Sequence, residues 1–158
     1  MKYRYTYSYM DVLLASPIDP MPSEKRRHQL TRMWGGLRAM ETSENPSYDD
    51  WEVVSNALNM METLVEMGWA RDEDGLIEDA VYELAVAGQR HVDTGAPIRL
   101  SGKGIQTIRA LLEDYATALE ELPHRTMMSC HRLTEKRVQD ILAKRVQAHD
   151  VVVTKEKQ

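Results

Sequence analysis

Residues 47–68, SYDDWEVVSNALNMMETLVEMG, decide the fold of this chain. Ser47 is a favourable N-cap, two aspartates follow in the first turn, where the helix dipole favours acids, and Gly68 suits the position just after the last turn. The apolar residues recur at helical spacing and leave only roughly one-third to one-half of the circumference polar, whereas a surface helix needs an apolar stripe of about 100°. The segment is therefore predicted to be a helix that is either central in a bundle or shared with a partner.

Four further segments repeat apolar residues at helical spacing, over residues 23–40, 74–91, 101–122 and 124–146. Ser23 is the expected N-cap of the first, Ser101 or Lys103-Gly104 opens the third, and Pro123 separates the last two. Because the connections are short, neighbouring helices should be antiparallel. The sequence predicts an all-α fold, a single bundle of about five helices over residues 23–149.

Two adjacent glycines, Gly35 and Gly36, lie inside the first of these segments. Each costs a helix about 1 kcal/mol relative to alanine. Such a cost indicates a close helix crossing at this point, or a kink.

The two ends of the chain have a different pattern. Tyrosines alternate with polar residues over the first nine positions, which predicts an extended segment, and Val151-Val152-Val153-Thr154 is also strand-like. A lone strand is unstable, so the two ends are expected to pair with each other or with a partner. The alternative is a disordered tail. We therefore divide the chain into a Tyr-rich arm and Pro-containing linker (1–22), the bundle (23–149) and a tail or short strand (150–158).

Composition indicates an ordinary globular protein. The chain has 158 residues, a net charge of −5, one cysteine and no apolar run of the roughly 20 residues that would cross a bilayer. A single domain in the cytoplasm, with no disulfide and no membrane contact, is the expectation.

Phenylalanine is absent and methionine occurs ten times. The methionines either fill the core flexibly or, at Met60, Met61 and Met67, form an adaptable binding surface.

No motif predicts a metal, a cofactor or catalysis. Cys130 and His131 are adjacent, so on a helix their side chains diverge by about 100° and do not grip one ion. A zinc site needs four ligands, and the sequence offers no such set. A lone cysteine beside Arg132 could be a nucleophile with a lowered pKa, but it is more often an inert apolar filler. We predict no catalytic residue.

Charge is sorted along the chain. Residues 41–83 hold thirteen acids and one base, Arg71. Together with the wide apolar surface of residues 47–68, this acidity predicts a surface that binds a basic partner protein. It could also occupy a nucleic-acid-binding channel of the partner by presenting carboxylates in place of phosphates. The predicted partner-binding residues are Trp51, Met60, Glu62, Glu66, Met67, Trp69, Asp72 and Asp74.

The last helical segment is basic and supports an alternative. A basic helix can lie against phosphates or enter the major groove of DNA, which would make the protein a DNA-binding transcriptional regulator. These bases could instead offset the acidic helices, internally or across a homodimer formed through residues 47–68. The candidate nucleic-acid-binding residues are Arg125, Arg132, Lys136, Arg137, Lys144 and Arg145.

Three groups of residues carry a resemblance that spans about three-quarters of the chain. They are Arg27-His28-Gln29-Leu30 with Trp34 and Leu37, then Asp50-Trp51 with Asn56, Asn59 and Glu62-Thr63-Leu64, and finally Arg125 with His131-Arg132-Leu133-Thr134 and Arg137. In these segments the chain resembles small helical proteins of proteobacterial phages, prophages and plasmids, which are uncharacterised or labelled as regulators. The resemblance implies a mobile-element accessory role and assigns no catalytic residue. Such proteins commonly bind and block host machinery, as anti-CRISPR-type inhibitors do. We therefore expect a non-enzymatic protein that binds a host protein complex and inhibits or adapts it.

Overall fold

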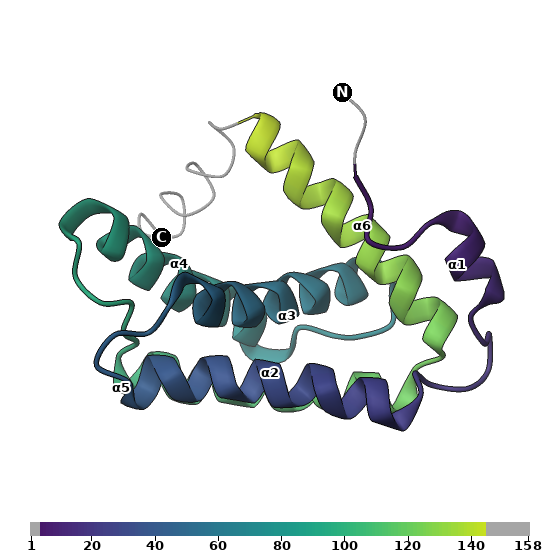
Figure 1. Ribbon diagram of the computed structural model, residues 1–158, viewed down its shortest axis with the longest axis horizontal. Helices are drawn as coiled ribbons and strands as arrows, with labels where there is room; N and C mark the ends of the chain where they lie inside the picture. Colours follow the sequence, from purple (N-terminus) through teal and green to yellow (C-terminus); the bar gives the residue numbers. More distant parts are fainter. Residues whose placement is uncertain (1–3, 145–158) are drawn as a thin grey trace.

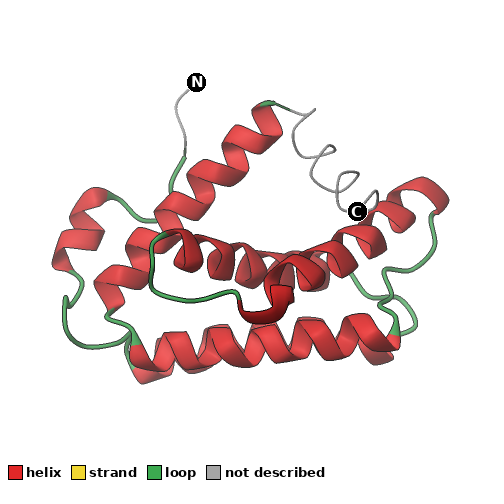
Figure 2. Cartoon of the chain, turned by 180° about the vertical axis from the view of Figure 1, so that it is seen from behind, coloured by secondary structure: helices red, strands yellow, loops and turns green. Residues whose placement is uncertain are grey.

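A computed structural model describes residues 4–144, and this part of the chain consists of helices joined by loops, with no strand (Figures 1 and 2). The elements are α1 (Tyr9–Leu14), α2 (Ser23–Thr42), α3 (Tyr48–Glu66), the 3₁₀ turn η1 (Glu73–Gly75), α4 (Leu76–Thr94), α5 (Gly102–Glu121) and α6 (His124–Ala143). The all-helical bundle is confirmed. None of its described helices is long and apolar enough to cross a membrane.

Helix α3 is the central element. It contacts α2, α4, α5 and α6, and its buried residues include Val54, Leu58, Met61 and Leu64. This position explains why its apolar surface is wider than a surface helix needs. Its ends follow the local sequence: Ser47 accepts a hydrogen bond from the backbone N–H of Asp50 in a capping box, and Gly68 has a positive φ of 83°.

The two adjacent glycines of α2 have different surroundings. A Cβ atom at Gly36 would lie 2.6 Å from the carbonyl oxygen of Asp50 and 2.6 Å from Cγ1 of Val53, so this glycine permits the close crossing of α2 and α3. A Cβ atom at Gly35 would meet nothing within 4 Å. Packing inside the bundle therefore explains the glycine at position 36, but it does not explain the glycine at position 35.

Most methionines fill the core. The buried ones are Met21, Met33, Met40, Met60, Met61, Met127 and Met128. Flexible thioether chains pack here against leucines and isoleucines, in the role that phenylalanine often has.

The N-terminal strand pair predicted from the tyrosine alternation is not found. Residues 4–8 form no strand, and α1 follows, begun by a capping box between Ser8 and Asp11. The backbone of this segment is instead bound by side chains of α6, so it needs no strand partner: Arg132 donates to the carbonyl of Tyr7, and Glu135 accepts from the N–H of Thr6. The other predicted strand, 151–154, lies outside the described residues.

Two helix starts differ from the prediction by a few residues. The N-cap of α2 is Pro22 and not Ser23, which is the first helical residue. Helix α4 begins at Leu76, after Asp74 and Gly75 have both taken positive φ angles. At both starts several neighbouring residues are suitable as the N-cap, so the sequence does not determine the first helical residue to within one or two positions.

Candidate protein-interaction surface

A groove with a volume of about 690 Å³ lies between the segment after α3 and helices α4 and α5. Its apolar lining includes Met61, Ile77 and Leu111 from the core. Carboxylates surround it, and Arg71 is the one basic side chain among its lining residues. We call this feature the acidic groove, and its acids are Asp72, Glu73, Asp74, Asp79, Asp114 and Glu121.

Local structure presents the carboxylates of the segment after α3. Gly68 ends that helix, and Trp69 then donates its backbone N–H to the carbonyl of Leu64. Asp72 accepts the N–H of Ile77 at 2.9 Å, and so caps the first turn of α4. The positive end of the α4 dipole favours acids at this place. The Trp69 side chain remains 50% exposed beside them, which combines an aromatic contact surface with negative charge.

The structure brings together three of the predicted partner-binding residues, Trp69, Asp72 and Asp74, which all line the acidic groove. Asp114 and Glu121 were not predicted as partner-binding residues, because they lie on α5, outside the acidic run of residues 41–83. They are seven residues apart, which places both on one face of a helix, and this spacing could have indicated a shared acidic surface.

Glu62 and Glu66 lie elsewhere and bind Arg137 of α6. The guanidinium is 3.9 Å from the carboxylate of Glu62 and 3.3 Å from that of Glu66, and it also donates to the backbone carbonyl of Asn59. Acidic residues of α3 and a basic residue of α6 therefore pair within the chain, which is one of the alternatives predicted from the sequence. Burial raises the pKa of the Glu62 carboxyl, and the nearby Arg137 lowers it in part.

The raised pKa of Glu62 predicts a pH dependence of stability. The folded state binds the Glu62 proton more tightly than the unfolded state, whose pKa is about 4.3. The stabilisation is present below that value and is lost as the pH rises through the folded pKa. We expect Glu62→Gln to remove this loss, so that its urea midpoint should fall less than that of the wild type between about pH 4 and pH 7. Glu52→Gln, an exposed position on the same helix, is the control. Equal behaviour of both variants would contradict the prediction.

The remaining predicted partner-binding residues belong to the bundle. Met60 is 5% exposed, and its sulfur and carbonyl contact the Cys130 thiol in the core, which corrects its expected partner-facing position. Trp51 is half-buried and donates its indole N–H to the carbonyl of Leu84 at 3.0 Å. Met67 is half-buried near the pair between Glu66 and Arg137. Core residues and interface residues are both apolar, so the sequence alone does not distinguish a buried residue such as Met60 from a partner-facing one.

Cys130 is fully buried. Burial raises the pKa of its thiol to about 11, against the smaller lowering effects of Thr134 and Arg137. This environment matches that of an inert core cysteine rather than a nucleophile. Among residues 4–144 no group of three or more metal-binding side chains comes together.

The basic residues of α6 are largely used within the chain. Arg125 donates to the carbonyls of Val12 and Ala15 at 3.2 Å and to that of Leu13 at 2.6 Å, and so caps the end of α1.

Arg132 lies between the rings of Tyr5 and Tyr9, 3.9 Å from each centroid. Lys136 and Lys144 are exposed, and Arg145 lies outside the described residues. Three of the six candidate nucleic-acid-binding residues, Arg125, Arg132 and Arg137, therefore hold the fold together.

The contacts of α6 hold α1 in place although α1 has no buried residue. Apolar side chains of this segment are between 61% and 80% exposed, namely Tyr9, Met10, Leu13, Leu14 and Ile18. We call them the α1 ledge. Several large apolar side chains exposed on one short segment are typical of a contact site.

Comparisons of the chain with protein-family models, with curated proteins and with solved structures found no match.

Proposed function

We propose that the protein is an interaction protein that binds a basic segment of a partner in the acidic groove. The observation that carries this proposal is that six carboxylates, one exposed tryptophan and apolar core side chains line a single groove. Aromatic residues supply contact area in interfaces, and opposite charge speeds the encounter and excludes wrong partners. A cationic segment with an apolar or aromatic side chain fits these features.

The proposed role is that of a mobile-element accessory protein which inhibits or adapts a host protein complex. A groove lined by carboxylates can compete with phosphates for the lysines and arginines of a nucleic-acid-binding host protein. The same chemistry serves an adaptor that holds a basic partner without blocking it. Anti-CRISPR-type inhibition is one example of this class of activity.

The DNA-binding alternative has less support from the geometry. Direct binding to phosphates needs basic side chains that are free to reach them. Arg125, Arg132 and Arg137 each bind groups of the chain itself, which leaves Lys136 and Lys144 exposed among the described candidates. We therefore place the acidic groove first.

Affinity capture from a proteobacterial lysate tests the proposal, with nuclease treatment and quantitative mass spectrometry. Asp114→Lys/Glu121→Lys reverses two charges of the groove at exposed positions of α5. Glu52→Lys/Glu113→Lys has the same change of net charge at exposed positions outside the groove. We expect that the wild type and the control capture the same set of proteins after nuclease treatment. The groove variant should capture at least about 10-fold less of these proteins. Equal capture by all three proteins, or recovery of nuclease-sensitive material alone, would overturn the proposal.

A further inference from the structure

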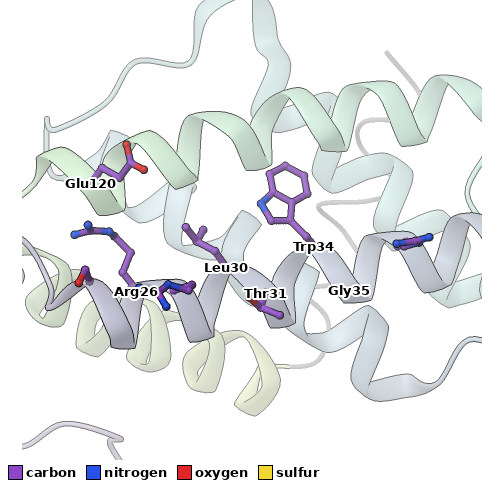
Figure 3. Close-up of a pocket in the computed structure, with 9 residues that line it drawn as sticks. Arg26, Leu30, Thr31, Trp34, Gly35 and Glu120 are labelled. Atoms are coloured by element: carbon purple, nitrogen blue, oxygen red, sulfur yellow. The ribbon is translucent and has the colours of Figure 1, made fainter.

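A second groove, also with a volume of about 690 Å³, lies between α2 and α5 (Figure 3). Leu30 and Trp34 point from α2 toward α5 and form its apolar part. Arg27 and Arg38 line it as well, both exposed, and no ion pair is found for either of them within residues 4–144. This groove is therefore basic and partly apolar, the opposite of the acidic groove.

The spacing of these residues along α2 is regular. Arg27 and Arg38 are eleven residues apart, which is about three turns and about 16 Å of helix, so the two guanidiniums lie on one stripe. Trp34 lies on the same stripe between them, four residues before Arg38. An apolar contact surface is thus bracketed by two cations at a fixed separation.

Gly35 adds an independent observation. It lines the groove, it is exposed, and a Cβ atom there would meet nothing within 4 Å, so nothing inside the bundle requires a glycine. It nevertheless costs the helix about 1 kcal/mol relative to alanine. At neighbouring Gly36 the missing side chain lets the backbone of α3 approach α2 closely. A bare backbone at Gly35 permits the same close approach from outside the molecule.

We propose that this groove binds an acidic helical segment of a partner protein, with two carboxylates at Arg27 and Arg38 and an apolar side chain against Trp34. The partner backbone passes over Gly35. A polypeptide fits better than a nucleic acid because the centre of the groove is apolar, and because an acidic helix can place carboxylates only at Arg27 and Arg38, whereas a nucleic acid carries a phosphate on every nucleotide. Glu120 on the opposite wall disfavours any further negative charge. The proposal is independent of the acidic groove, because the two grooves share no lining residue.

The probe is a fluorescein-labelled, alanine-based helical peptide that carries two glutamates about eleven residues apart around a central leucine. Fluorescence anisotropy with the full chain should show saturable binding below about 1 mM, and the same peptide with glutamines should bind at least about 10-fold more weakly. An oligothymidine strand should not compete.

Three protein variants complete the test. Arg27→Glu/Arg38→Glu should weaken binding of the acidic peptide at least about 10-fold, while Arg32→Glu/Lys103→Glu, with the same change of charge at exposed positions outside the groove, should change it less than about 2-fold. Gly35→Leu should also weaken binding about 10-fold although its urea midpoint is not lowered, because leucine favours the helix. Failure of the peptide to bind, equal binding by Gly35→Leu, or tighter binding of the oligothymidine would overturn the proposal.

Discussion

Replacing Gly36 by alanine is expected to destabilise the protein by about 2 kcal/mol. The new Cβ would lie 2.6 Å from the carbonyl oxygen of Asp50, which belongs to the backbone of α3 and cannot rotate away. Helices α2 and α3 must separate to accept it. Overpacking costs typically about 1–3 kcal/mol, and two contacts of 2.6 Å place this site at the upper end of that range. The gain in helix propensity, about 1 kcal/mol, offsets part of that cost. Urea unfolding monitored by circular dichroism measures the difference.

The matched control is the preceding residue. Gly35→Ala adds the same methyl group to the same helix, where it meets nothing within 4 Å. It should therefore stabilise the protein by about 0.5–1 kcal/mol. Opposite signs at two adjacent glycines would separate the effect of packing from that of propensity. A neutral Gly36→Ala would show that the crossing of α2 and α3 is not as close as described. A destabilising Gly35→Ala would show that a side chain at this position does meet a neighbour.

Replacing both Arg125 and Arg132 by alanine is expected to release α1 from the bundle. The two side chains make four hydrogen bonds to backbone carbonyls of residues 7–15, and Arg132 also contacts two tyrosine rings. Hydrogen bonds of charged donors contribute about 1.5–3 kcal/mol each. Helix α1 has no buried residue of its own, and the contacts that remain hold its flanks: Thr6 to Glu135 before it, and the carbonyls of Ser16 and Asp19 after it. We expect the protection of the Val12 and Ala15 amides against hydrogen exchange to fall by at least about 100-fold.

The release should remain local, because the core of α3 and α5 does not include α1. Protection of the Leu58 and Leu112 amides should therefore be unchanged. Lys136→Ala/Lys144→Ala removes two charges from exposed positions of the same helix and is the control for net charge. If that control opens α1 as well, or if the arginine variant leaves Val12 and Ala15 protected, the arginines do not hold the segment.

Features of the fold that depend on neighbouring residues were predicted correctly. The start of α3 at Ser47 and its end before Gly68 depend on residues within one turn, and both are confirmed. Its central position was one of two interpretations, since a wide apolar surface is equally suited to a core and to an interface. The N-terminal segment was predicted wrongly because its partners, Arg132 and Glu135, are more than a hundred residues away in the sequence. No periodicity within nine residues contains that information.

The candidate site was predictable to the same extent. Trp69, Asp72 and Asp74 follow one another closely and belong to one acidic run, so their common surface could be inferred from composition. Asp114 and Glu121 reach the same groove only because α5 packs beside α4. The basic helix was misleading for the opposite reason: the charge of Arg125 and Arg137 is visible in the sequence, whereas the carbonyl and carboxylate groups that bind them are not.

The attachment of α1 to α6 has a consequence for the order of events during synthesis. Tyr7 and Arg132 are 125 residues apart, so at about 5–20 residues per second the ribosome needs about 6–25 s to produce the arginine after the tyrosine. The α1 ledge is made first and gains its contacts with α6 only after α6 has been made. A nascent or truncated chain without α6 lacks the Arg125 and Arg132 contacts that position the ledge. Only a finished molecule presents it in a defined orientation, so any partner that recognises the ledge in this form distinguishes complete copies of the protein from incomplete ones.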